Sequence, residues 1–422
     1  MQEEKSIEPA HPPLTRQGNF VKLWTGQSAA LIGYEISEMA LPLLAILVLE
    51  TDAGELGIIG AARWLPFLLF SLWAGVWIER RRRIPVMIAA DLTRAALMIA
   101  VVSLALTDLL TLPILIAAVF LLGAGTVMFD ISYTTVLPSV VPQEQLVKAN
   151  GWLQASGSVA QVGGPGFAGV LVQWLTAPVT LLGQALSFLV SGGCLAAIRI
   201  DEKVPEQPEH RPNGLTSLKE GLVMAFGDPV LRSLVGIGAL FNMFSQWVVA
   251  MFPLFAIREI GLSAGTMGAV VSAAAVGGLV GSMTVGRLSE RIGPGRVIIA
   301  SSVIASIPFA LVAFSPERHA IAIPWLIACF AVAGYGWTIG GIMITSVRQA
   351  YTPRAFLARV NATYRFLGYG LVSVGVFAGG LLGEAASLRT TLLVGAIGSM
   401  TAMVWSILSP LRGLRKMPAQ EA

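Results

Sequence analysis

Long apolar segments almost free of charge limit what this chain can fold into. Residues 112–129 contain no ionisable side chain, and charged residues make up 12% of the sequence against 55% hydrophobic ones. A soluble domain carries about 25% charged residues, so these segments require lipid around them. Only helices or a closed barrel pair every backbone group in lipid, and the segments are too long for barrel strands. We therefore expect an all-α membrane protein.

The apolar windows predict twelve transmembrane helices, because a bilayer core of about 30 Å is crossed by roughly 20 helical residues. They lie near 20–49, 56–78, 84–107, 112–139, 149–175, 177–198, 230–257, 263–287, 295–315, 320–349, 358–383 and 387–410. The predicted organisation is a tail, two six-helix bundles joined by a polar linker, and a second tail. These parts comprise residues 1–19, 20–198, 199–229, 230–410 and 411–422.

Positive charges gather on one side of the predicted spans. The connections on the side of the termini hold most of the basic residues, whereas those on the other side hold only Arg258, Arg318 and Arg389. The excess of Lys and Arg in cytoplasmic loops predicts that both termini are cytoplasmic, in a bacterial inner membrane. It also explains the net charge of +4 without a nucleic-acid partner.

The polar linker contains Leu215, Leu218, Leu222 and Phe226 at helical spacing. This pattern predicts a short amphipathic helix on the cytoplasmic membrane surface. A linker turn that packs on itself is the alternative.

Several function classes lack the residues they need. The two cysteines, Cys194 and Cys329, lie in apolar segments, and the three histidines lie in the N-terminal tail or in loops, so we predict no metal site. No GxxxxGK[ST] phosphate loop occurs, which disfavours ATP-driven transport. No catalytic constellation is present, so we predict neither an enzyme nor a cofactor, and a proton gradient as the energy source.

The two halves repeat at a constant offset of 211 residues, which places Pro42 opposite Pro253 and Asn150 opposite Asn361. Six spans per half give both repeats the same orientation, with a substrate site between them near the middle of the membrane. The repeat therefore predicts two pseudo-symmetric bundles that rock about a central site.

A loop motif occurs once in each half. The motif consists of a glycine, three further residues, an acid, an arginine and then more basic residues. The first copy reads GVWIERRRR at 75–83, with Arg82 where the motif has glycine, and the second begins at Gly286. With these motifs the chain resembles the major facilitator superfamily over its whole length, and most closely its enterobactin exporters and macrolide efflux proteins. The resemblance implies a cytoplasmic gate formed by Gly75, Glu79, Arg80, Arg83, Gly286, Glu290, Arg291, Gly293 and Arg296.

The resemblance also implies that the acid of each loop motif contacts a helix of the other half. Glu79 would face the helix that starts near Ala358, and Glu290 the helix that starts near Ala149. A carboxylate is stabilised at a helix N-terminus, and these contacts would form only in the outward-facing state. The simpler alternative is that the arginines of the motif only hold this loop on the cytoplasmic side of the membrane.

The fifth predicted span contains GGPGFAG at 163–169. It is similar to the glycine-proline motif of antiporting exporters, with Ala168 in place of one glycine. The motif residues Gly164, Pro165 and Gly169 would bend the helix and let it pack closely. Helix packing alone is the alternative.

Charges within the spans are expensive and therefore informative. Six lie in the N-terminal half, opposite uncharged repeat mates, namely Glu35, Glu38, Arg63, Asp91, Arg94 and Asp130. We therefore expect charges within the spans in one half only. We hypothesise that Glu35, with Glu38, exchanges a proton for cargo, because burial favours the neutral acid. Asp130 is a second candidate. The alternative is permanent pairing of Glu35 or Glu38 with Arg63, and of Asp91 with Arg94.

The facing wall offers amide and aromatic groups that suit a large amphipathic cargo, namely Asn242, Gln246, Trp247, Tyr335 and Trp337. The sequence thus favours a monomeric, proton-coupled antiporter that exports hydrophobic or amphipathic small molecules such as drugs. Siderophore export is one alternative, in which an anionic cargo would prefer Arg63. A lipid-moving or regulatory membrane protein is another.

Overall fold

The computed structural model describes residues 12–78, 81–142, 145–200, 214–352 and 357–415, and these contain helices but no strand. The N-terminal half holds α1 (Gly18–Val48), α2 (Ala53–Ile78), α3 (Arg83–Leu106), α4 (Leu112–Val140), α5 (Leu146–Leu175) and α6 (Ala177–Ala196). The linker holds α7 (Gly214–Gly227). The C-terminal half holds α8 (Pro229–Arg258), α9 (Ala264–Ile292), α10 (Pro294–Ala313), α11 (His319–Tyr351), α12 (Leu357–Ala385) and α13 (Leu388–Leu408).

Eleven of the helices in the described ranges are long and apolar enough to span a membrane. This confirms the all-α membrane fold but not the predicted count of twelve spans. The long helix outside that set is α5, whose 30 residues include Gln154 and Gln161 and several serines and glycines. Amides and small residues lower the hydropathy of this helix, although α5 packs against α1 and α9 as a member of the bundle.

The two halves repeat the same packing pattern. In the N-terminal half, α1 contacts α5 and α6, α2 contacts α4, and α3 contacts α4 and α6. In the C-terminal half, α8 contacts α12 and α13, α9 contacts α11, and α10 contacts α11 and α13. Each pair in one half has its counterpart six helices later, once α7 is left out, as the sequence repeat requires.

The halves join through α2 with α12 and α5 with α9. A methyl group at Gly57 would lie 2.5 Å from the Gly380 Cα, and one at Gly169 would lie 2.5 Å from the Ala264 carbonyl oxygen. These contacts lie where α2 and α9 begin, at the end of the bundles remote from the chain termini, which we name the closed end. Glycine is needed there because a side chain would separate the helices.

Hydrogen bonds and apolar packing also hold the closed end. Arg258, the last residue of α8, donates to the carbonyl oxygens of Glu50 at 3.0 Å and Thr51 at 2.7 Å, in the α1–α2 loop of the other half. The largest buried apolar cluster includes residues of both halves, among them Leu44 and Phe252. The two halves are therefore tightly packed at this end.

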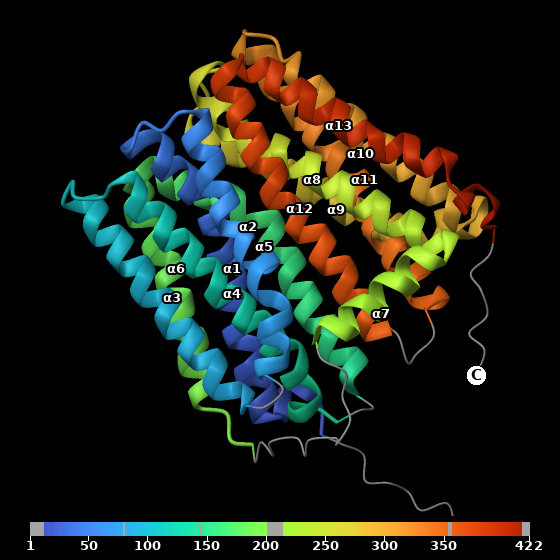
Figure 1. Ribbon diagram of the computed structural model, residues 1–422. Helices are drawn as coiled ribbons and strands as arrows, with labels where there is room; N and C mark the ends of the chain where they lie inside the picture. Colours follow the sequence, from blue (N-terminus) through green and yellow to red (C-terminus); the bar gives the residue numbers. More distant parts are fainter. Residues whose placement is uncertain (1–11, 79–80, 143–144, 201–213, 353–356, 416–422) are drawn as a thin grey trace, which may run out of the picture.

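At the opposite end the bundles diverge, and α7 lies across this side of the molecule (Figure 1). The helix contacts α12 and α8 of the C-terminal half and α2 of the N-terminal half. Along it, Leu222 is half-buried, whereas Val223 and Phe226 are exposed. The described structure is thus packed at one membrane face and splayed at the other, which we name the α7 end.

Candidate functional site

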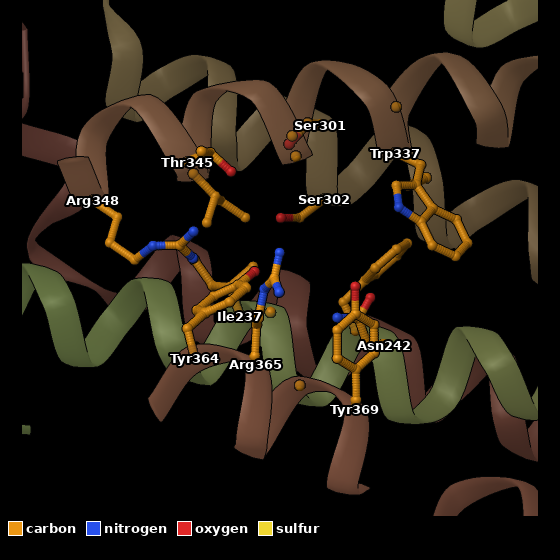
Figure 2. Close-up of a pocket in the computed structure, with 18 residues that line it drawn as sticks. Ile237, Asn242, Ser301, Ser302, Trp337, Thr345, Arg348, Tyr364, Arg365 and Tyr369 are labelled. Carbon is orange, nitrogen blue, oxygen red and sulfur yellow. The ribbon is translucent and has the colours of Figure 1, made fainter. Parts of the chain in front are cut away.

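Three adjoining cavities lie between and within the halves. The C-half cavity, of about 330 Å³, is lined by α8, α10, α11 and α12 (Figure 2). The N-half cavity, of about 280 Å³, shares Tyr369 with it. The closed-end cavity, of about 240 Å³, shares Arg63 and Trp64 with the N-half cavity. The shared residues make the three cavities neighbouring compartments of one central site.

The closed-end cavity contains the acids of α1. Glu35 and Glu38 line it beside Arg63 of α2, and Glu38 forms an ion pair with Arg63. The Arg63 guanidinium also lies 5.3 Å from the ring centre of Tyr34. Glu35 has no ion-pair or hydrogen-bond partner among the residues that the structure describes. Of the two pairings left open by the sequence, the structure therefore has the one with Glu38.

The glycine-proline motif of α5 lies directly against Glu35. A methyl group at Gly164 would lie 2.3 Å from the Glu35 Cβ, so only glycine lets α5 approach α1 here. Pro165 lines the closed-end cavity, and Gly169 packs on Ala264 of α9. One short segment of α5 thus contacts both the acid of its own half and the neighbouring half.

The ion pair on α3, formed by Asp91 and Arg94, is buried. Asp91 and Arg94 are bonded at 2.5 Å, and their side chains are 0% and 6% exposed. The Arg94 guanidinium lies between the rings of Phe129 and Phe188, at 4.6 and 4.4 Å from their centres. Arg94 also donates to the Thr126 hydroxyl at 3.3 Å. This geometry fixes Arg94 between α3, α4 and α6 and suits a role in folding.

Asp130 of α4 lines the N-half cavity. Two arginines act on it electrostatically, Arg94 of its own half and Arg365 of the other half. Asp130 therefore interacts electrostatically with an arginine of each half.

The expectation that span charges lie in one half only is wrong. Arg348 of α11 and Arg365 of α12 line the C-half cavity and point into it (Figure 2). Both lie close to the ends of predicted spans, and the charge pattern therefore assigned them to cytoplasmic connections. Both are site residues because they belong to helices of the bundle and line its cavity, Arg348 as a buried side chain and Arg365 as an exposed one.

The predicted pocket wall divides into two groups. Asn242 and Trp337 line the C-half cavity, and Gln246 lines the closed-end cavity. Trp247 instead packs against Gly379 and Gly395, where added methyl groups would lie 2.7 and 3.0 Å from its ring. The fifth residue, Tyr335, lines none of these cavities, and its hydroxyl is bonded to Thr284 at 3.2 Å.

Sequence reasoning missed an aromatic cluster at the centre of the site. Tyr369 of α12 stacks on Trp64 of α2, with ring centres 5.5 Å apart, and contacts Phe67 at 5.4 Å. Trp64 and Phe67 are three residues apart on one helix, a spacing that could have marked a shared face. The cluster joins the halves where the N-half and C-half cavities meet.

The described residues of the two loop motifs lie at the α7 end. Glu79 and Arg80 are outside the described residues, Gly75 lies in the last turn of α2, and Arg83 begins α3. In the second copy Glu290, Arg291 and Arg296 are exposed, and nothing lies within 4 Å of a methyl group at Gly286. Gly293 ends α9 with a φ of +88°, a backbone conformation that favours glycine.

The described residues contain no group of three or more His, Cys, Asp or Glu side chains arranged to hold a metal ion.

Comparison with known proteins gives consistent matches. A family model described as transmembrane secretion effector matches residues 9–421. The chain is similar to macrolide efflux protein A of Streptococcus pyogenes, with 23% identity over 85% of the chain and 89% of the relative. It is 26% identical to the enterobactin exporter EntS of Citrobacter koseri, over 75% and 80% of the two chains. It is 27% identical to the multidrug efflux pump Tap of Mycobacterium bovis, over 92% and 93%.

Solved structures show the same fold at low identity. A bacterial homologue of the iron transporter ferroportin in its inward-facing state superposes with a TM-score of 0.77 and 17% identity, over 94% of this chain and 99% of that one. The nucleoside transporter NupG gives a TM-score of 0.74 and 13% identity, over 92% and 98%.

Proposed function

This chain belongs to the transmembrane secretion effector family of the major facilitator superfamily, and on that premise we propose that it exports amphipathic small molecules in exchange for protons. Members of this superfamily are transporters rather than enzymes, and the relatives named above export drugs or a siderophore. We further propose that both termini are cytoplasmic, as the charge asymmetry indicates. The splayed α7 end then faces the cytoplasm, and this conformation receives cargo.

The observation that carries the proposal is the unpartnered Glu35 in the closed-end cavity. Its neighbour Glu38 forms an ion pair with Arg63, whereas Glu35 has no ion-pair or hydrogen-bond partner among the described residues and Arg63 acts on it only electrostatically. A carboxylate removed from water is tolerated better when it is neutral. The packed closed end therefore favours protonated Glu35, and a closed end open to water would favour the carboxylate.

This preference gives an order of events for exchange. Cargo enters from the α7 end and displaces the proton from Glu35, and the charged acid then favours opening of the closed end. Release of cargo to the outside lets Glu35 take up an external proton, which favours return to the packed arrangement. Proton uptake and cargo release thus occur on the same side of the membrane, as export by antiport requires.

The loop motif supports closure of the α7 end in the opposite state. Glu290 is exposed and has no ion-pair partner among the described residues, and Gly286 faces open space. Both features suit a surface that meets another helix only when the α7 end closes. We propose that Glu290 then lies at the N-terminus of α5, where the helix dipole stabilises a carboxylate.

A second candidate function, siderophore export, is favoured by two observations. Enterobactin exporters are among the relatives, and the central site contains two arginines in the C-terminal half in addition to Arg63. Such a site can accept an anionic cargo as well as a neutral one.

Transport by reconstituted protein tests the proposal. Proteoliposomes that enclose a pH-sensitive dye would be given a pH gradient and either radiolabelled erythromycin or enterobactin. Accumulation of either solute, with matching proton movement in wild type but not in Glu35→Gln, is the expected result. Solute-independent dye signals, or equal accumulation by both proteins, would contradict proton-coupled export.

A further inference from the structure

The C-half cavity has a strongly one-sided charge. Its charged lining residues are Arg348 and Arg365, and no Asp or Glu lines it within the described ranges. Figure 2 shows both guanidinium groups directed into the cavity, that of Arg348 over Tyr364 and that of Arg365 toward Ser302 of α10. A cavity lined by two positive charges and no acid attracts an anion.

Arg348 is held in place but not fully bonded. It is only 8% exposed, its Nε donates to Asn361 Oδ1 at 2.9 Å, and its guanidinium lies 3.9 Å from the ring centre of Tyr364. Its Nη1 is buried and has no hydrogen-bond partner among the residues that the structure describes. An unsatisfied buried donor is costly, and an acceptor that enters the cavity would remove the cost.

Arg365 supplies the second charge. Its side chain is exposed to the cavity and forms no ion pair with any described residue. Asp130 acts on it only electrostatically, from the wall of the N-half cavity. Two guanidinium groups, one buried and one accessible, can therefore bind a single anionic group. Guanidinium groups bind carboxylates through paired, charge-assisted hydrogen bonds.

Aromatic rings border the same cavity. Trp337 and Phe241 pack edge to face, with ring centres 5.6 Å apart, and Tyr369 closes the side toward the N-terminal half. From this combination we infer that the C-half cavity is a subsite for the carboxylate of an aromatic, amphipathic cargo. The inference rests on the proposed export function and adds that the C-half cavity prefers an anionic group of the cargo over a cationic one.

Binding of a charge-matched pair of probes tests the inference without transport. Calorimetry would compare 2-naphthoate with 2-naphthylmethylammonium, which share the ring system and differ in the sign of charge. Wild-type protein in detergent should bind the carboxylate about tenfold more tightly or better, as two charge-assisted contacts allow. Arg365→Gln should reduce this ratio severalfold, because only Arg348 then remains, and Arg365→Lys should retain more of it.

Arg232→Gln is the matched control, because Arg232 is exposed on α8 and lines none of the three cavities. It removes the same charge and should leave the ratio unchanged. Equal binding of both probes by wild type, or equal loss in Arg232→Gln and Arg365→Gln, would overturn the subsite. Selective binding without gradient-driven transport would instead contradict the export proposal alone.

Discussion

Gly164 of α5 packs against the side chain of Glu35 on α1, so closely that a methyl group at Gly164 would lie 2.3 Å from the Glu35 Cβ. This contact joins the glycine-proline motif to the unpartnered acid of the central site. The same segment of α5 reaches Ala264 of the other half through Gly169. Movement between the halves can therefore change the surroundings of Glu35 directly.

The adjacent glycines Gly163 and Gly164 give a matched pair of variants. Gly164→Ala should displace Glu35 and reduce gradient-driven transport severalfold, because the new methyl group has no space. Gly163→Ala should transport like wild type, because nothing lies within 4 Å of a methyl group there. Proteoliposome flux at equal protein amounts measures both. Equal activity of the two variants would exclude a functional role for the contact.

Glu35 and Glu38 should differ in what their substitution removes. Glu35→Gln should leave the thermal stability of the detergent-solubilised protein unchanged and abolish the pH dependence of transport. Glu38→Gln should lower Tm instead, because Arg63 loses its ion-pair partner. Thermal unfolding and pH-dependent flux, measured on both variants, separate these outcomes. A loss of stability in Glu35→Gln with normal proton coupling would reverse the assignment.

The buried pair on α3 should contribute to stability rather than to coupling. Asp91→Asn leaves the charge of Arg94 without its partner and should lower the free energy of unfolding by about 3–5 kcal/mol. The double variant Asp91→Asn/Arg94→Gln should lose less, since no charge then stays buried. Unfolding in mixed SDS micelles measures both values. A cost in Asp91→Asn below about 1 kcal/mol would contradict this role.

Bulky residues at the two ends should shift the conformation in opposite directions. Gly57→Val would push against Gly380 and disfavour the packed closed end, whereas Gly286→Val fits this conformation and would hinder closure of the α7 end. Alkylation of Asn242→Cys, in a chain whose native cysteines are replaced, reports access from the α7 end. It should slow in Gly57→Val and be maintained or accelerated in Gly286→Val.

Much of the fold follows from the sequence because lipid imposes simple rules. Helices α1 and α13 begin and end within a few residues of the predicted spans, since apolar length fixes them. The repeat predicted the matching packing of the two halves. The count of spans was less secure, because α5 carries amides and glycines that serve packing and lower its hydropathy.

The central site was predicted only in part, for a physical reason. Charges deep inside apolar segments, such as Glu35 and Asp130, are visible in a sequence because their cost requires a role. Arg348 and Arg365 lie close to span ends, where anchoring and cargo binding look alike. Tyr369 and Trp64 meet only after the halves pack together, and no local pattern contains that contact.

Spin-label distances across both ends test the central claim, that protonation of Glu35 sets which end is closed. One labelled pair, Leu109→Cys with Glu317→Cys, spans the closed end, and another, Lys148→Cys with Arg287→Cys, spans the α7 end. Between pH 5.5 and pH 8.5 we expect the first distance to lengthen and the second to shorten in wild type. Glu35→Gln should hold both distances at their low-pH values. An identical pH response in Glu35→Gln, or distances that change in the same direction at both ends, would contradict the account.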